Sequence, residues 1–262
     1  MKINVIAVFP QILDSLNYGV TGTAIEKNIL EIQRIDLKDY PLNSYGSIDD
    51  KPFAGSEGMI ISPIPISKAI SLVKNKGKVI YLSPQGKTLN QKKVKELATL
   101  NDLTIICGRY EGIDQRIIDE YVDEEISIGD YVLSGGEIAA TVLIDSIVRN
   151  LPGALGNEKS LTNDSFSDGR LKGHSYTRPR DFEGREVPDE LVSGNHEIMK
   201  EWKIANSLWV TKQKRPDLFS NLQLSEKEMI LLQKYELAQK NLRKGDGWKY
   251  SWKVWKRAIK RT

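Results

Sequence analysis

The sequence predicts an α/β fold followed by a smaller helical region, and three observations support this prediction. Apolar, β-branched runs alternate with amphipathic segments as far as residue 153. Two of these runs lead directly into glycine-rich loops, at residues 108–112 and 129–136. Such loops lie at the carboxyl ends of strands, where open α/β sheets bind their ligands. Beyond residue 173 the chain becomes basic, and its apolar residues follow a helical spacing.

Strands are expected where apolar and β-branched residues are concentrated. The first run has the composition of a buried strand, and no G-x-G-x-x-G sequence follows it. That absence argues against the dinucleotide-binding Rossmann site, in which the first strand leads into a phosphate-binding loop. The expected strands are residues 2–9, 29–37, 78–88, 103–107 and 124–128.

Helices are expected where apolar residues recur every three or four positions. The segment 135–153 is apolar almost all the way round, so it should be buried on several sides, either in the core or against a symmetric partner subunit. A short charged helix is expected between the two glycine-rich loops. The other expected helices are residues 11–18, 21–28, 65–77, 89–100, 189–209 and 225–241.

Charge is distributed unevenly along the chain. The 262 residues carry a net charge of +3, but residues 1–169 have a net charge of −6 and residues 170–262 a net charge of +9. A basic region of this kind indicates a polyanionic partner, and nucleic acid is favoured over membrane because most of the segment is not apolar enough to insert. Charge alone leaves open the alternative of a solvated basic face.

Composition also bears on the location of the protein. No apolar stretch reaches the roughly 18 to 20 residues that cross a bilayer, and residues 1–10 lack the pattern of a secretory signal, so we expect a cytoplasmic protein without a membrane partner. Cys107 is the only cysteine, which excludes an internal disulfide. His174 and His196 lie far from it in sequence, so we expect a buried packing role for Cys107 and no zinc site.

The two glycine-rich loops are the candidate ligand site. Glycine allows the main chain to approach a ligand closely, so these loops are expected to recognise a flat or polar molecule through main-chain groups. A packing role would be ordinary for one such loop. Two of them favour a common pocket, because charged and aromatic residues lie among their glycines: Arg109, Tyr110 and Glu111 in the first loop, and Asp130, Tyr131 and Ser134 in the second.

A rival site lies at residues 81–88. Gly86, Lys87 and Thr88 match the end of a phosphate-binding P-loop. Tyr81, however, stands where that motif has its first glycine, and Pro84 removes a main-chain donor from the phosphate cradle. Nucleotide binding of the P-loop type is therefore the less favoured alternative.

Four strings of the sequence resemble those of one enzyme family. They are GRYEGIDQR at residues 108–116, SIGDYVLSGGE at 127–137, SFSDG at 165–169 and GHSYTRPRDFEG at 173–184. These strings, and the chain from Met1 to about Leu242, resemble the bacterial tRNA (guanine-N1)-methyltransferase family TrmD of the SPOUT superfamily. The strings are long enough that chance is a poor explanation.

The resemblance implies a knotted fold, which general rules of chain connection do not predict. Residues 1–156 would form a SPOUT methyltransferase domain, a parallel sheet with helices on both faces whose loops are threaded into a deep trefoil knot. Residues 157–172 would be an interdomain linker. Residues 173–262 would form a small all-α domain that binds tRNA and ends in a basic, Trp-rich extension. Members of the family are homodimers with the active site at the subunit interface.

The implied activity is the S-adenosylmethionine-dependent methylation of guanine N1 in the guanosine immediately 3′ of the anticodon, so the implied partner is the anticodon stem-loop of tRNA. By resemblance, Asp164 is the general base, although on position alone it would be an ordinary solvated loop acid. Arg149 is implied to stabilise the guanine oxygen.

The resemblance also implies how the cofactor is held. Glu111 would lie near its methionine end or near a magnesium ion, to which the family's activity is linked, and no residue is assigned as a metal ligand. The implied cofactor-binding residues are Tyr81, Leu82, Ser83, Pro84, Gly108, Tyr110, Glu111, Ser127, Ile128, Gly129, Asp130, Tyr131, Val132, Leu133, Gly135 and Gly136.

The chain departs from the family pattern at two places. Lys172 stands where the family has an aspartate, so a function tied to that acid is not expected here. The loop at residues 47–60, long enough to suggest a function, lacks the family's tyrosine, glycines and proline and has instead Phe53, Ala54, Ser56 and Glu57.

A C-terminal extension lies beyond the matched part of the chain. Its large apolar residues share one face of a basic helix, for which docking on the body of the protein is favoured over a nucleic-acid or membrane contact. These residues are Trp248, Trp252, Trp255 and Ile259. For the chain as a whole, a non-catalytic RNA-binding protein of the same fold is the alternative function.

Overall fold

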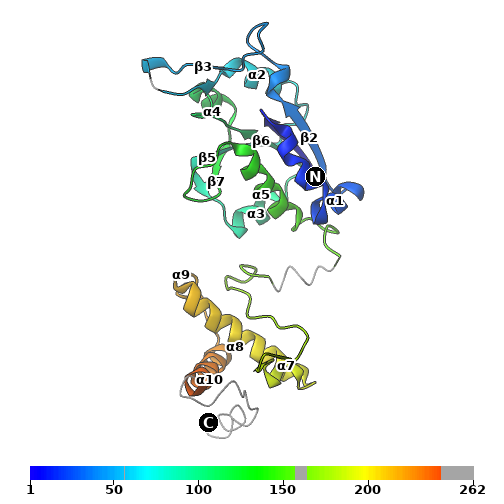
Figure 1. The fold of residues 1–262 in the computed structure, drawn as a ribbon, viewed down its shortest axis with the longest axis vertical. Coiled ribbons are helices and arrows are strands. Elements are labelled where there is room, and N and C mark those ends of the chain that lie inside the picture. The colour runs from blue at the N-terminus through cyan, green and yellow to red at the C-terminus, as the bar shows by residue number, and fades with distance from the viewer. Residues whose placement is uncertain (56, 157–163, 243–262) are drawn as a thin grey trace. The chain divides into compact units, whose positions relative to one another are not determined.

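The computed structural model of the chain describes residues 1–55, 57–156 and 164–242 (Figure 1). It consists of two compact units, Met1–Glu158 and Lys159–Thr262. Several sequence predictions fall outside the described residues: the role of Ser56, the part of the linker at residues 157–163, and the helical face of Trp248, Trp252, Trp255 and Ile259.

A five-stranded parallel sheet forms the centre of the first unit (Figure 1). Its order is β2-β1-β6-β5-β7, and every neighbouring pair is parallel. In β1 and β6 only the first residue is not fully buried, because a sheet covered on both faces buries nearly every side chain. All the strands predicted from apolar runs are present: β1 (Lys2–Ala7), β2 (Glu31–Asp36), β5 (Lys78–Thr88), β6 (Asp102–Cys107) and β7 (Glu124–Ser127).

Helices cover both faces of this sheet. Alternate residues of a strand point to opposite faces, so Val5 packs in a core with residues of η1, α1, α3 and α5, whereas Ile6 packs in a second core with residues of α2 and α4. The segment predicted as a first helix is a 3-10 helix. The helices of this unit are η1 (Pro10–Asn17), α1 (Gly19–Glu26), α2 (Pro63–Ser71), α3 (Gln91–Leu97), α4 (Gln115–Tyr121) and α5 (Gly136–Val148).

The long loop between β2 and α2 contains short elements that the sequence did not predict. Residues 49–50 and 60–61 of this loop pair as a two-stranded antiparallel ribbon, and Phe53 between them is 95% exposed. The elements are η2 (Leu37–Asp39), β3 (Asp49–Asp50), η3 (Phe53–Gly55) and β4 (Ile60–Ile61).

Strand β5 is interrupted where it pairs with β7. Leu82 and Lys87 both pair with Ile126, so residues 83–86 leave the ladder as a bulged loop. Gly86 closes this loop directly against β7, because a Cβ atom there would lie 2.4 Å from main-chain atoms of Glu125 and Ile126. The bulge turns the chain outward at the carboxyl edge of the sheet.

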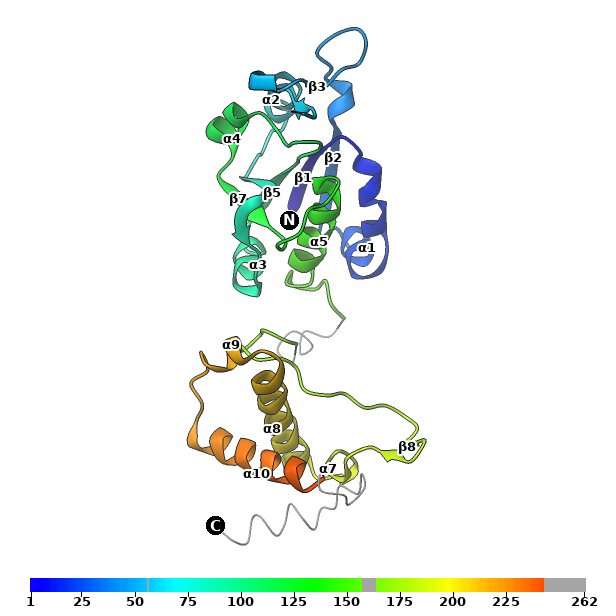
Figure 2. The ribbon, with the colours of Figure 1, turned by 60° about the vertical axis from the view of Figure 1, so that its left-hand side comes forward.

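The second unit is mainly helical (Figure 2). A core that includes Trp202, Leu231 and Tyr235 joins α8 to α10. The prediction of an all-α domain needs correction, because β8 (Asp181–Phe182) and β9 (Arg185–Glu186) pair as a short antiparallel ribbon. The helices are α7 (Asp189–Val192), α8 (His196–Lys214), α9 (Pro216–Phe219) and α10 (Glu226–Leu242).

The predicted helix at residues 189–209 is split into α7 and α8. Gly194, with φ of +72°, ends the first segment in a left-handed conformation. Asn195 then caps the second, because its side-chain oxygen accepts hydrogen bonds from the main-chain nitrogens of Glu197 and Ile198. None of the helices that the structure describes is both long and apolar enough to cross a membrane.

Candidate functional site

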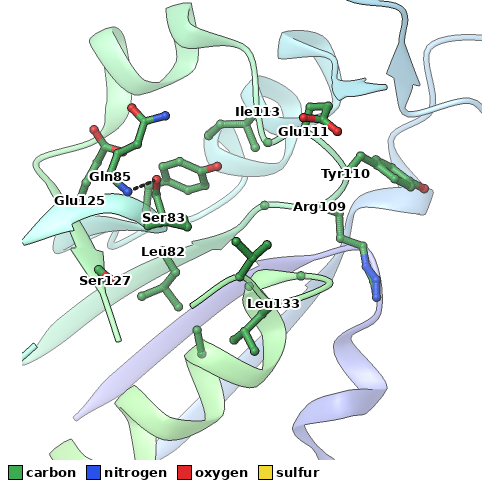
Figure 3. Close-up of a pocket in the computed structure, with 18 of the residues that line it drawn as sticks. Leu82, Ser83, Gln85, Arg109, Tyr110, Glu111, Ile113, Glu125, Ser127 and Leu133 are labelled. Atoms are coloured by element: carbon green, nitrogen blue, oxygen red, sulfur yellow. Dashed lines mark hydrogen bonds between the residues drawn. The ribbon is translucent and has the colours of Figure 1, made fainter. Parts of the chain in front are cut away.

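A cavity of about 570 Å³ lies at the carboxyl edge of the sheet (Figure 3). It is lined by the bulged loop of β5, the loops that follow β6 and β7, and the start of α5. The two glycine-rich loops therefore share one pocket, as the sequence predicted. The predicted cofactor-binding residues that line it are Tyr81, Leu82, Ser83, Pro84, Gly108, Tyr110, Glu111, Ser127, Ile128, Gly129, Tyr131, Val132, Leu133, Gly135 and Gly136.

Asp130 is the predicted cofactor-binding residue that does not line the cavity; its side chain is exposed. Other residues that line the cavity were not predicted from the sequence, because a glycine pattern identifies loops and not the side chains around them. Among these are Gln85, Ile113, Asp114 and Glu125.

The loop after β6 is held by main-chain hydrogen bonds. The Gly112 nitrogen donates to the Arg109 carbonyl at 2.9 Å, and Tyr110 between them has a φ of +57°. The loop is also joined to the neighbouring segment, because the Glu111 nitrogen donates to the Met59 carbonyl at 3.0 Å. These contacts fix the main chain of the loop independently of any ligand.

Tyr81 supports this loop from beneath. Its ring is buried in the core on the α2 and α4 side, and its hydroxyl group would lie 2.7 Å from a Cβ atom at Gly108. Burial raises the pKa of the Tyr81 phenol, the charge of Glu125 raises it further, and a hydrogen bond with the Ile113 main chain opposes both. Tyr81 therefore stays protonated near neutral pH and acts as a structural support.

The loop after β7 is closed by short-range contacts. The Ser127 hydroxyl group bonds both the nitrogen and the carbonyl of Gly129, at 3.2 and 3.1 Å, and the Tyr131 hydroxyl donates to the Ile128 carbonyl. Gly129, with φ of +148°, has no room for a side chain, since a Cβ atom there would lie 2.4 Å from the Tyr131 ring. The loop ends at α5.

The two glycine-rich loops touch at the first residue of α5. The Gly136 nitrogen donates to the Gly108 carbonyl at 2.8 Å. A Cβ atom at Gly136 would lie 2.9 Å from the Cα atom of Cys107. Two loops separated in sequence by a helix and a strand are thus packed main chain against main chain.

A buried carboxylate, which the sequence analysis did not single out, reinforces this contact. Glu137 is 1% exposed, and its Oε1 accepts a hydrogen bond from the Phe9 nitrogen at 3.2 Å and lies 3.8 Å from Nε of Arg109. The Arg109 guanidinium also stacks over the Phe9 ring, 4.5 Å from its centre. Burial, and then the charge of Glu137, raise the pKa of the Cys107 thiol well above its usual range, which supports the packing role expected for Cys107.

Lys87 does not lie in a phosphate-binding loop. It pairs with Ile126, and Thr88 pairs with Ser127, so the segment is part of β5. A P-loop runs from a strand through a glycine-rich loop into a helix that begins at its Lys-Ser/Thr pair. The nucleotide-binding alternative for residues 81–88 is therefore wrong.

The two residues implied in catalysis are described in different units. Arg149 caps the carboxyl end of α5, about 20 Å along the helix from Gly136 at a rise of 1.5 Å per residue, so it lies at the opposite end from the cavity. Asp164 lines a cavity of about 410 Å³ in the second unit, and its Oδ1 lies 3.5 Å from Nζ of Lys172.

Potential metal ligands do not gather in one place in the described part of the chain. No cluster of three or more His, Cys, Asp or Glu side chains with a geometry for a metal ion occurs among residues 1–55, 57–156 and 164–242. Glu111 is exposed and lines the cavity as the sequence led us to expect. Nearby, hydrogen bonds from the Arg116 side chain lower the pKa of the Asp114 carboxyl.

Comparison with known proteins identifies related sequences. The family described as tRNA (Guanine-1)-methyltransferase TrmD matches residues 1–221. The tRNA (guanine-N(1)-)-methyltransferase of Clostridium perfringens (strain SM101 / Type A) is 47% identical over 234 residues, which are 88% of this chain and 99% of the relative. The protein of that name from Clostridium novyi (strain NT) is 46% identical over 237 residues, 90% and 98% of the two chains. That of Buchnera aphidicola subsp. Schizaphis graminum (strain Sg) is 50% identical over 232 residues, 87% and 88% of the two chains.

Proposed function

The chain belongs to the tRNA (guanine-1)-methyltransferase TrmD family, and from that premise we propose that it transfers a methyl group to N1 of a guanine in tRNA. The methyl donor is S-adenosylmethionine, and the target is the guanosine immediately 3′ of the anticodon. The observation that carries the proposal is that the bulged loop of β5 and the loops that follow β6 and β7 meet in one cavity.

The cavity fits this donor in size and chemistry. A volume of about 570 Å³ is within the range of small-molecule sites. Leu82, Ile128 and Leu133 offer apolar walls for a purine ring, while the surrounding loops present main-chain donors and acceptors for its polar edge and for a ribose. Glycines stand where a side chain would clash with the protein itself, so the loops can pack closely enough to form one cavity.

The reaction requires the proton on guanine N1 to be removed while N1 forms its new bond to carbon. When bound, S-adenosylmethionine supplies a methyl group made electrophilic by its positively charged sulfur. The Asp164 carboxylate accepts the N1 proton as general base. The Arg149 guanidinium faces guanine O6, where negative charge accumulates as the proton leaves.

A homodimer would complete this site. Arg149 lies at the far end of α5 from the cavity of its own chain, so a second copy packed antiparallel along α5 would bring its Arg149 towards that cavity. Ile138 and Val142 on α5 are 47% and 46% exposed, and they offer the apolar contact that such packing needs. The active site is then formed at the subunit interface.

The connections around the site are proposed to form the trefoil knot of SPOUT enzymes. The contact between Gly136 and Gly108, and the return of α5 over the face of the sheet that carries η1, support this threading. Residues 1–156 form the methyltransferase domain, residues 157–172 the linker and residues 173–262 the domain that grips the anticodon stem-loop. A tRNA substrate is met in the cytoplasm.

Magnesium would be held mainly by ligands other than the protein. Glu111 supplies one carboxylate in the cavity, and Mg²⁺ commonly keeps several waters when only one or two carboxylates bind it. The described residues therefore fit a shared magnesium ion better than a dedicated metal site.

The decisive test uses two tRNA transcripts that differ only in guanosine or adenosine after the anticodon. The full chain is incubated with each transcript and methyl-labelled S-adenosylmethionine. Label is expected in the guanosine transcript alone, at N1. Label in both transcripts would contradict the proposed position. Binding of both without label would instead support the non-catalytic RNA-binding alternative.

A further inference from the structure

Asp164 begins a tight turn in the second unit. The Ser167 nitrogen and hydroxyl group both donate to the Asp164 carbonyl, at 3.3 and 2.7 Å. The Phe166 nitrogen donates to the Arg170 carbonyl at 2.7 Å, and Phe166 has a φ of +69°. The main chain of Asp164 therefore has a defined position, from which its carboxylate extends.

The segment that follows this turn, residues 171–174, is fastened to α8. The Leu171 nitrogen donates to the Thr211 hydroxyl at 2.9 Å, and the Ser207 hydroxyl donates to the Leu171 carbonyl at 2.6 Å. At the other end, the His174 nitrogen donates to the buried Asn206 side chain. We call residues 171–174 the α8 strap. Although the first two of these residues were assigned to a linker from the sequence, the segment is tied to a helix at both ends.

Lys172 lies in the middle of the α8 strap and is joined to the Asp164 turn twice. Its nitrogen donates to the Ser165 hydroxyl at 2.9 Å, and its Nζ lies 3.5 Å from Oδ1 of Asp164. Both residues line the same cavity of about 410 Å³. The ammonium group is thus presented to one carboxylate oxygen from a fixed main chain.

The neighbouring cation of the turn is directed to other acids. Arg170 bonds Asp168 at 2.7 Å and Glu228 on α10 at 2.9 Å. Those contacts hold the end of the turn against α10. Lys172, in contrast, faces Asp164.

The Lys172 pair is exposed, which limits what it does for folding. The two side chains are 52% and 34% exposed, and ion pairs in such surroundings contribute little to stability. A contact that fixes one oxygen of a general base instead affects the reaction rate, because catalysis depends on the orientation of the reacting group.

We propose that Lys172 is a positioning residue for methyl transfer. This inference rests on the function proposed above, in which Asp164 is the base. The Lys172 ammonium group holds Oδ1 and so orients the Asp164 carboxylate towards the guanine. The N1–H bond breaks, its proton passes to this carboxylate, the bond from the donor's sulfur to the methyl group breaks, and the N1–methyl bond forms. The proton then leaves Asp164 for solvent before the next turnover.

The test compares Lys172→Met and Lys172→Arg with a matched control, Lys227→Met. Lys227 forms a similar exposed ion pair with Glu201 at 2.9 Å in the same unit. Single-turnover rates are measured at saturating tRNA and S-adenosylmethionine, together with the affinity for each. We expect Lys172→Met to lower the rate about fivefold to tenfold with both affinities unchanged, because orientation and not binding is lost. Lys172→Arg should restore the rate to within about twofold, and Lys227→Met should not change it.

The possible outcomes distinguish a failure of the role proposed for Lys172 from a failure of the role proposed for Asp164. Wild-type rates in both Lys172 variants, alongside an inactive Asp164→Asn, would overturn the inference and leave the proposed function intact. An equal loss in Lys172→Arg and Lys172→Met would also overturn it, since the positive charge would then not be the cause. A fully active Asp164→Asn would remove the base itself. Thermal unfolding of every variant separates loss of folding from loss of orientation.

Discussion

The loops of the cavity in the first unit are held mainly by main-chain contacts, whereas the α8 strap of the second unit is held by side chains of α8. In the cavity, glycines and main-chain hydrogen bonds hold loops that come from three strands. In the second unit, Asn206, Ser207 and Thr211 of one helix hold a segment with no regular secondary structure. The difference matches the two tasks proposed above, since binding a cofactor needs a rigid shape and moving a proton needs one well-placed group.

Replacing the proposed base should have the largest effect on turnover, and it tests most strongly whether the two units have different tasks. Asp164→Asn removes the group that accepts the proton, so turnover should fall at least about 100-fold, the lower range of general-base contributions. The control is Asp168→Asn, an acid in the same turn that pairs with Arg170; it should lower turnover less than about threefold. Initial rates of methyl transfer measure both. An unimpaired Asp164→Asn would break the assignment of proton transfer to the second unit.

The second largest effect is expected when a methyl group is added to a glycine in the wall of the cavity. Gly86→Ala places a Cβ atom 2.4 Å from the main chain of Glu125 and Ile126, so the bulged loop of β5 must move away from β7. We expect a loss of about 1–3 kcal/mol in the free energy of unfolding, the usual effect of overpacking. Cofactor affinity should fall at least about tenfold, because the wall of the pocket shifts.

The matched control for that change is Gly156→Ala. Gly156 has no atom within 4 Å of a Cβ atom, so alanine fits there. Isothermal titration of S-adenosylmethionine and chemical denaturation followed by circular dichroism compare the two variants. Equal behaviour of both would show that the main-chain contacts of the cavity do not control its shape.

Removing one hydroxyl group beneath the cavity should have a moderate effect. Tyr81→Phe deletes the hydroxyl group that bonds the Ile113 main chain, and a typical buried hydrogen bond contributes about 1 kcal/mol. The first unit should lose that stability, and cofactor affinity should weaken about threefold as the loop after β6 loosens. Tyr45→Phe, at a site that is 93% exposed, is the control and should change neither quantity.

The smallest predicted effect lies in the second unit and depends on pH. Glu190 is fully buried, its two carboxylate oxygens have no side-chain hydrogen-bond partner among the described residues, and burial raises the pKa of its carboxyl above 4.5. The folded state therefore binds this proton more tightly than the unfolded state, so stability falls as pH rises above 4.5. Glu190→Gln should raise the stability of this unit by about 1 kcal/mol at pH 8 and by less near pH 5.

Tryptophan fluorescence measures that difference in the second unit alone, because every tryptophan of the chain lies beyond residue 200. The control is Glu186→Gln, an exposed carboxyl on β9. If Glu190→Gln lowered the stability at pH 8, the carboxylate would be stabilised in the folded state, and burial would not be the dominant effect on its pKa.

The sequence predicted the cavity better than it predicted the second unit. Apolar runs fix which strands are buried, and glycines report where main chains must approach, so the central strands and the shared pocket were found. Both patterns are local. The contacts that the sequence missed are long-range: Glu137 reaches Phe9, and Asn206 and Thr211 reach the α8 strap. The spacing of residues along the chain does not predict such contacts.

Short elements were also missed, for a related reason. The ribbon of β8 and β9 has two residues in each strand, too few for an alternating pattern, and the bulge of β5 appears only when register with β7 is known. Asp164 could be named only through resemblance, because an aspartate in a polar segment is ordinary by composition.

Equilibrium binding of methyl-labelled S-adenosylmethionine, without tRNA, to the wild-type chain, Gly86→Ala and Asp164→Asn tests the central claim most directly. The claim is that the loops of the first unit hold the cofactor and the second unit supplies the proton acceptor. We predict equal affinity for the wild type and Asp164→Asn and strongly reduced affinity for Gly86→Ala. Undiminished binding by Gly86→Ala, with binding lost in Asp164→Asn, would contradict the account.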